Sequence, residues 1–278
     1  MATGMSLHVG LNAVDPKQYG GWDGKLKACE ADAKDMIALA KKMKFKTRAL
    51  FTADATAEAA IAEIARAAKR LTTGDMFFFT YSGHGGQVPD KNGDEQDRMD
   101  ETFVFYNRQL VDDELYALWS QFAPGVRIFV LSDCCHSGTN TRAPLYDRFA
   151  KLPAKGKSSA RKPRYRAMPE DVRDRTYAEH KKMYDSIQKE HRAGEKVAVN
   201  ASILLISGCQ DNQLSADGDR NGLFTENVLK VWKKGQFSGN YGAFHRAIAG
   251  KMPPWQSPNF FRTGVKDARY EAQQPLSI

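Results

Sequence analysis

The chain has 278 residues, of which 42% are hydrophobic, and it carries a formal net charge of +8. That length and apolar content can bury a sizeable core, as one large domain or two small ones. The longest apolar runs, near Met76 and Ile128, have the length of strands, and Met1–Gly10 lacks the features of a signal peptide, so we expect no membrane association. The four cysteines are few for a secreted disulfide scaffold. We therefore expect a cytoplasmic protein with reduced thiols.

The positive charge belongs to one segment. Between Arg142 and Lys196 there are sixteen Lys and Arg residues against eight Asp and Glu, a difference equal to the whole net charge. Few aromatic residues are interleaved with these charges, whereas nucleic-acid surfaces typically combine the two. We therefore expect no nucleic-acid partner.

Strand and helix patterns alternate in the first part of the chain. Apolar and polar residues follow a period of 2 in the strands and about 3.6 in the helices. The expected elements are a strand at Ser6–Asn12, a loop at Val14–Gly24, a helix at Lys25–Lys44, a strand at Thr47–Phe51, a helix at Ala55–Leu71 and a strand at Met76–Tyr81. This order predicts right-handed crossovers onto a mostly parallel sheet, and hence an α/β fold.

The rest of the chain continues the pattern around two irregular stretches. Gln87–Glu101 is rich in acidic residues and predicts a loop, and Lys151–Arg166 is basic with Pro, Gly and Ser, which predicts an exposed, mobile segment. No strand pattern appears from Thr139 to about Asn200. The other expected elements are strands at Thr102–Tyr106, Val126–Ser132, Ser202–Gly208 and Asn259–Thr263, and helices at Asp112–Phe122, Pro169–Arg192, Leu223–Lys234 and Tyr241–Met252.

Two of the buried strands end in residues that carry chemistry. Met76–Tyr81 leads into Ser-Gly-His-Gly-Gly with His84 at its centre, and Val126–Ser132 leads into Asp-Cys-Cys-His-Ser-Gly with Cys135. The carboxyl ends of parallel strands meet at one edge of the sheet, where α/β folds place their active sites. A thiol and an imidazole brought together there can form a nucleophilic dyad. Either residue alone would more often be structural.

The motifs YSGHGG and DCCHSG, about fifty residues apart, resemble the His and Cys boxes of metacaspases, the caspase-like cysteine peptidases of clan CD. The segment ISGCQDNQLSAD…NGLFT also resembles that family. The resemblance implies a three-layer caspase-like fold, with a mostly parallel central β-sheet flanked by helices on both faces. It divides one caspase-like domain into a large-subunit-like half (1–138), a basic variable linker (139–200) and a small-subunit-like half (201–278).

The resemblance implies that Cys135 is the nucleophile, because Cys134 stands where the box tolerates Cys or Ser. Adjacent residues also point to opposite sides of a strand, so only one of the two can face His84. His84 would act as general base and then as acid to the leaving amine, and the Gly85 and Cys135 N–H groups would stabilise the oxyanion. His136 is expected to be structural, since three consecutive residues cannot converge on one zinc ion. The chemistry requires no cofactor.

Specificity should follow from charge beside the nucleophile. Asp133 lies two residues before Cys135 and therefore on the same side of the strand, where its carboxylate would attract Lys or Arg at P1, the residue before the scissile bond. By resemblance, Cys29, Asp32 and Ser82 complete the P1 pocket. Without the family, Asp32 would be an ordinary acidic residue in the first turn of a helix.

A calcium site is a further expectation from the resemblance. Asp100, Asp112 and Asp113 match positions where calcium-dependent metacaspases place ligands, and carboxylates suit this hard cation. Arg142 departs from the family, because it stands where a fourth acidic ligand would align. Calcium would act as an activator, and the alternative is a solvated acidic loop with a capping Asp.

An enzyme that cleaves after Arg or Lys would find its own cleavage sites in the basic linker. The candidates for self-cleavage are Lys151, Lys155, Lys157, Arg161, Lys162, Arg164 and Arg166. The leading hypothesis is thus a self-processing, Arg/Lys-directed cysteine endopeptidase acting as a monomer on protein or peptide substrates. The alternatives are a catalytically silent caspase-like module that binds basic segments, and a clan CD peptidase with another P1 preference.

Overall fold

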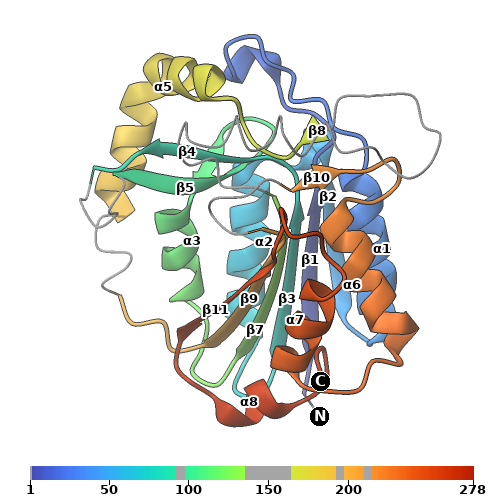
Figure 1. Ribbon diagram of the computed structural model, residues 1–278. Coiled ribbons are helices and arrows are strands. Elements are labelled where there is room, and N and C mark those ends of the chain that lie inside the picture. Colours follow the sequence, from blue (N-terminus) through green and yellow to red (C-terminus); the bar gives the residue numbers. More distant parts are fainter. Residues whose placement is uncertain (1, 92–97, 135–163, 192–196, 210–214) are drawn as a thin grey trace, which may run out of the picture.

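The computed structural model describes residues 2–91, 98–134, 164–191, 197–209 and 215–278. Figure 1 shows three layers, with a twisted sheet between two sets of helices. The sheet has the strand order β11-β9-β7-β3-β1-β2, and all neighbouring strands are parallel except β11, which is antiparallel to β9. Its strands are β1 (Gly4–Gly10), β2 (Lys46–Phe51), β3 (Met76–Ser82), β7 (Arg127–Asp133), β9 (Ser202–Ser207) and β11 (Asn259–Gly264). The predicted α/β sheet is confirmed.

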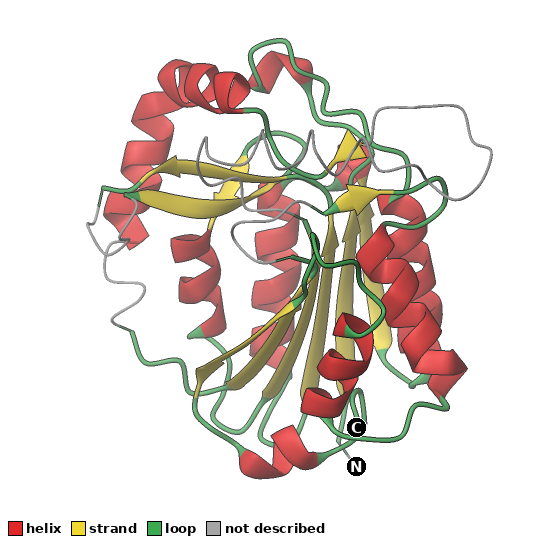
Figure 2. Ribbon diagram, viewed as in Figure 1, coloured by secondary structure: helices red, strands yellow, loops and turns green. Residues whose placement is uncertain are grey.

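Both faces of the sheet are covered by helices because its central strands are apolar on both sides. In β3, Phe77 and Phe79 face one core and Phe78 faces the other, as the period of 2 requires. The first core includes α2 (Ala57–Arg70) and α3 (Asp112–Trp119). The second includes α1 (Cys29–Lys42), α6 (Leu223–Trp232), α7 (Tyr241–Ala249) and α8 (Ala268–Ala272). Figure 2 shows the helices on the two sides of the sheet, and among the described residues none has both the length and the hydropathy needed to cross a membrane.

The acidic stretch predicted as a loop is partly a hairpin. β4 (Gly85–Pro89) pairs with β5 (Met99–Val104), and β5 pairs with β6 (Gln109–Val111), all antiparallel. The prediction of a loop over Gln87–Glu101 is therefore wrong at both ends. The acidic composition concealed these strands. Their buried polar groups are paired across the ladder; for example, Thr102 donates a hydrogen bond to Gln109 Oε1 at 2.7 Å.

The basic segment also departs from expectation where the structure describes it. β8 (Arg164–Tyr165) pairs antiparallel with β10 (Ala216–Asp217), and α5 (Glu170–His191) follows. Arg164 is exposed as predicted, but Arg166 is fully buried, so the expectation of an exposed segment is wrong at that residue. A two-residue strand has no periodicity to detect, and only distant residues explain the burial of Arg166.

Candidate active site

The ends of β3 and β7 meet as the sequence predicts. These strands are parallel neighbours, and their register pairs Ser82 with Asp133 at the carboxyl edge of the sheet. His84 follows Ser82 by two residues. Cys135 follows Asp133 by two residues and lies outside the described part of the chain, as do His136 and five of the self-cleavage candidates, Lys151, Lys155, Lys157, Arg161 and Lys162.

Cys134, the last described residue before that gap, faces the core. Its side chain is buried among the residues that pack under α2 and α3, and its Sγ lies 3.0 Å from Ser132 Oγ. Its carbonyl accepts a hydrogen bond from Cys209 Sγ at 3.3 Å. The thiol of Cys134 therefore packs inside the protein, on the side of the sheet covered by α2 and α3.

His84 is buried, with its ring held on one side. Its Nε2 lies 2.9 Å from the carbonyl oxygen of Gly24, a contact that requires a proton on Nε2. Nδ1 has no hydrogen-bond partner in the described part of the chain, and the Trp22 ring lies 4.7 Å from the His84 ring. Burial lowers the pKa of His84 to about 4, against a smaller opposite effect of Gly24. At pH 7 the imidazole is therefore neutral and can accept a proton.

The backbone around His84 leaves no room for a side chain at Gly83. A Cβ there would lie 2.6 Å from the Tyr81 hydroxyl oxygen. That hydroxyl lies 2.7 Å from the carbonyl oxygen of His84 and 2.8 Å from that of Val104. The close approach of Tyr81 thus fixes the turn that presents the imidazole.

The P1 pocket predicted from the sequence contains Arg166 of this same chain. Its guanidinium forms ion pairs with three carboxylates, those of Asp32 at 2.7 Å, Asp133 at 2.9 Å and Asp217 at 3.1 Å. It also donates hydrogen bonds to Ser82 Oγ at 2.9 Å and to the Asp133 carbonyl at 3.2 Å. Charge-assisted bonds of this kind suit the fork of a guanidinium. In this structure the pocket therefore holds the cationic side chain of Arg166.

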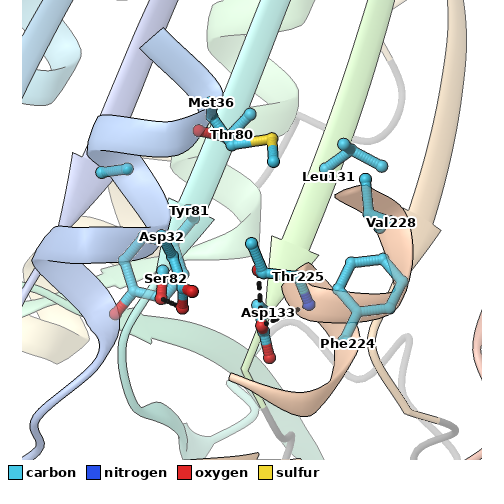
Figure 3. A pocket seen from close by; sticks show the side chains of 11 residues that line it. Asp32, Met36, Thr80, Tyr81, Ser82, Leu131, Asp133, Phe224, Thr225 and Val228 are labelled. Atoms are coloured by element: carbon cyan, nitrogen blue, oxygen red, sulfur yellow. Dashed lines mark hydrogen bonds between the residues drawn. The ribbon is translucent and has the colours of Figure 1, made fainter. Parts of the chain in front are cut away.

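Hydrogen bonds hold the carboxylates of Asp133 and Asp32 in place. Asp133 accepts hydrogen bonds from Ser215 Oγ at 2.7 Å and from Thr225 N–H and Oγ1 at 3.1 and 2.7 Å, at the start of α6. Asp32 accepts from Ser82 Oγ at 2.8 Å and from Gly222 N–H at 3.0 Å. Figure 3 shows Asp32 with Ser82 on one side of the pocket and Asp133 with Thr225 on the other. These bonds preorganise the negative charge.

Apolar side chains of the core lie next to these charges. Side chains of the core, including Met36, Leu131, Phe224 and Val228, line a cavity next to Asp32 and Asp133 (Figure 3). Gly222 packs against Arg166, and a Cβ at Gly222 would lie 2.6 Å from the guanidinium carbon. Low polarity around the pocket strengthens the attraction between its charges.

Three carboxylates face one cation, and the pKa values reflect this imbalance. Burial raises the pKa of Asp32 to about 6; Arg166 opposes that shift and Asp133 adds to it. The pKa of Arg166 is raised well above its usual value, because the surrounding negative charges outweigh its burial. Cys29 lies beside this cluster, and burial raises the pKa of its thiol to about 12. Cys29 is therefore a neutral wall of the pocket.

The main chain around Arg166 crosses the site in extended form. Tyr165 pairs with Ala216 in the β8–β10 ladder, and the Arg166 N–H donates to the Ser215 carbonyl at 3.0 Å. The Gly85 N–H donates to the Arg166 carbonyl oxygen at 3.0 Å, and the Met168 N–H donates to the Gly85 carbonyl at 2.8 Å. The chain is thus bound on both sides of the Arg166–Ala167 peptide bond.

Asp217, Ser215 and Gly222 were missed as site residues. All three lie in or beside ISGCQDNQLSAD…NGLFT, the segment already singled out by its resemblance to metacaspases. The acidic side chain of Asp217 within that segment was the available signal. Nothing local shows that it faces Asp32, which is far away in the sequence.

The carboxylates proposed to bind calcium lie near one another. Burial raises the pKa of Asp112 well above its usual value, and the charges of Asp100, Glu101 and Asp113 raise it further. In the part of the chain that the structure describes, however, no three His, Cys, Asp or Glu side chains are arranged to hold a metal ion. These side chains therefore do not form a ligand set in their present positions, and Arg142 lies outside the described residues.

The layered fold, with its mostly parallel sheet between two sets of helices, is that of a caspase-like α/β protein, and comparison with known proteins agrees. The family model for the caspase domain matches residues 13–270. The chain therefore belongs to the caspase domain family. Caspase-1 from Spodoptera frugiperda shares the fold, with a TM-score of 0.52 and 11% identity over 95% of this chain and 86% of that one.

Within the family the chain is similar to metacaspases. Metacaspase-1 of Kluyveromyces lactis is 30% identical over 243 residues, 78% of this chain and 55% of that protein. Metacaspase-1A of Aspergillus clavatus is 36% identical over 154 residues, 50% of this chain and 34% of that protein. The chain thus spans about half or less of these relatives. Protein GSU0716 from Geobacter sulfurreducens, a solved structure, is 50% identical with a TM-score of 0.89 over 99% of both chains.

Proposed function

We propose that this protein is a cysteine endopeptidase that cleaves after Arg or Lys and that it processes itself at the Arg166–Ala167 bond. The observation that carries the proposal is the seating of Arg166. Its side chain fills the acidic pocket while its carbonyl oxygen accepts a hydrogen bond from Gly85 N–H. That is how a P1 residue binds to a peptidase with an oxyanion donor.

The chemistry is acyl transfer. The Cys135 thiolate attacks the carbonyl carbon of Arg166, and the Gly85 N–H stabilises the negative charge that develops on the oxygen. His84 takes the thiol proton and delivers it to the amine of Ala167, which leaves as a new N-terminus. Water then hydrolyses the thioester and regenerates the thiol. Support for His84 comes from its neutral imidazole and from the next residue, Gly85, whose N–H donates to the Arg166 carbonyl at 3.0 Å.

Peptides that differ only at P1 test the specificity. We expect efficient hydrolysis after Arg, slower hydrolysis after Lys, and at least about a hundredfold lower kcat/KM after Asp or Gln, because only Arg matches several carboxylates at once. The measurement is kcat/KM on fluorogenic peptides. A preference for another P1 residue would favour a different clan CD peptidase. Binding of Arg peptides without turnover would favour a silent interaction module.

The pKa of Asp32 predicts how activity depends on pH. Because that pKa is about 6, Asp32 is a carboxylate above pH 6 and loses its charge below it. Protonation removes one of the charges that hold a cationic P1 side chain, whereas His84, with a pKa of about 4, stays neutral through this range. We expect the rate of self-cleavage after Arg166, the state to which this pKa applies, to fall as the pH drops through about 6, and Asp32→Asn to remove this step. A profile that is flat between pH 5 and 7 would contradict the prediction.

The carboxylates around Asp112 motivate one further proposal, activation by calcium. A cation would offset the neighbouring negative charges, which add to the effect of burial on the pKa of Asp112, although the described side chains are not arranged as a set of metal ligands. We expect added calcium to accelerate cleavage of an Arg peptide, and neither calcium nor a chelator to affect the Asp112→Asn variant. Wild-type activity that does not respond to calcium or chelator would remove this proposal.

A further inference from the structure

The segment after Arg166 indicates a second specificity site, and this inference rests on the proposed function. If Arg166–Ala167 is the scissile bond, Met168 is P2′, the second residue after the cut. The Met168 side chain is only 1% exposed, and its N–H donates to the Gly85 carbonyl at 2.8 Å. The same glycine donates to the Arg166 carbonyl, so the P1 and P2′ backbones are bound by one residue.

The Met168 side chain packs in a small apolar cluster that is separate from the two main cores. Its other members are Val14, Tyr19 and Val104, with Trp22 at the edge, and Val172 from α5. The first three lie within residues 1–166, so they stand on the other side of the Arg166–Ala167 bond from Met168. They therefore form a receptor surface for the side chain that lies two positions beyond the scissile bond.

The loop that forms this surface is held rigidly. The Tyr19 hydroxyl donates to the Phe105 carbonyl at 2.5 Å, and the Val14 N–H donates to the Asp23 carbonyl at 3.0 Å. The Trp22 ring stands between the cluster and His84, 6.1 Å from the Tyr19 ring and 4.7 Å from the imidazole. A preformed apolar surface next to the catalytic imidazole has the properties of a substrate subsite.

We propose that Val14, Tyr19, Trp22 and Val104 form a subsite that selects an apolar side chain at P2′. Charged residues are disfavoured there, because the described cluster offers no partner for a buried charge. Full burial of a methionine side chain corresponds to a gain of about tenfold or more in kcat/KM over a charged residue. The subsite would extend the preference for Arg at P1 to sequences with an apolar residue two positions after the cut.

Two kinds of peptide separate this inference from the proposed function. A fluorogenic substrate with Arg at P1 and the fluorophore directly after it has no P2′ residue, so its hydrolysis by the self-processed chain reports only on the proposed function. Quenched peptides with Arg at P1 and Met, Leu, Asp or Lys at P2′ report on the subsite. We expect the Met and Leu peptides to exceed the Asp and Lys peptides by about tenfold or more in kcat/KM.

Val14→Asp provides a test that does not depend on the amount of folded enzyme. A carboxylate in the subsite should reverse the preference, so that the Lys peptide is cleaved faster than the Met peptide by the same preparation. Equal rates for all four peptides in the wild type would mean that Met168 serves only to pack the start of α5, and would overturn the subsite. A chain that hydrolyses none of the substrates would overturn the proposed function, and the subsite with it.

Discussion

Replacing Cys135 by alanine should leave the chain intact under conditions in which the wild type separates into residues 1–166 and 167–278. The thiol is the group that would attack the Arg166 carbonyl, and loss of a nucleophile typically lowers the rate by about a thousandfold or more. Intact mass measured over time for the two purified proteins gives the extent of cleavage and identifies the bond.

Cys134→Ala is the matched control, because the Cys134 thiol is next to Cys135 in the sequence but packs in the core under α2 and α3. We expect this variant to cleave itself like the wild type, with a small loss of stability from the missing sulfur atom. Adding active enzyme to the Cys135→Ala chain then separates cleavage between molecules from cleavage within one. Self-processing is wrong if purified Cys135→Ala is cut as fast as the wild type.

Arg166→Gln should lower the rate of cleavage after residue 166 by about a hundredfold or more. Glutamine has a similar length but no charge, so it cannot pair with the carboxylates of Asp32, Asp133 and Asp217. Removing one partner of a buried ion pair costs about 3–5 kcal/mol. Arg166→Lys should retain slow cleavage, because an ammonium keeps the charge but matches fewer of the carboxylates.

Arg164→Gln is the control for this variant. Arg164 lies two residues away in the same segment, but its side chain is exposed, so we expect cleavage at the wild-type rate. Circular dichroism and thermal unfolding of Arg166→Gln show whether the chain still folds without its buried cation. Fragments that end at Lys151, Lys155, Lys157, Arg161 or Lys162 in both variants would retain self-processing but move it to another bond.

Several site residues were predictable because the signal for each is local. The apolar strands ending in His84 and Asp133 are continuous in sequence, and the carboxyl ends of parallel strands lie together at one edge of a sheet. The prediction that Asp32 and Ser82 line a P1 pocket came from resemblance, and the structure places both within hydrogen-bond distance of Arg166. The place of Cys135 in the site stays a prediction, because that residue lies outside the described part of the chain.

Other features depended on pairings that no local pattern records. The strands β4 and β5 were hidden by acidic composition, and their stability comes from the antiparallel ladder that joins them. Asp217 lies in the two-residue strand β10, and its pairing with β8 brings it to the guanidinium of Arg166. Basic composition predicted that Arg166 would be exposed, whereas three carboxylates compensate for its burial.

From its residues alone, this chain could be assigned an alternating α/β architecture, an imidazole and a thiol after neighbouring strands, and a basic segment in which to look for self-cleavage. Hydrophobic periodicity and short motifs carry that information, since each is set by adjacent residues. Only the tertiary structure singled out Arg166, and Arg164 is the one other candidate that lies in the described part of the chain. The choice depends on Asp32, Asp133 and Asp217 converging on one guanidinium, and the folding of distant segments onto one sheet edge brings these charges together.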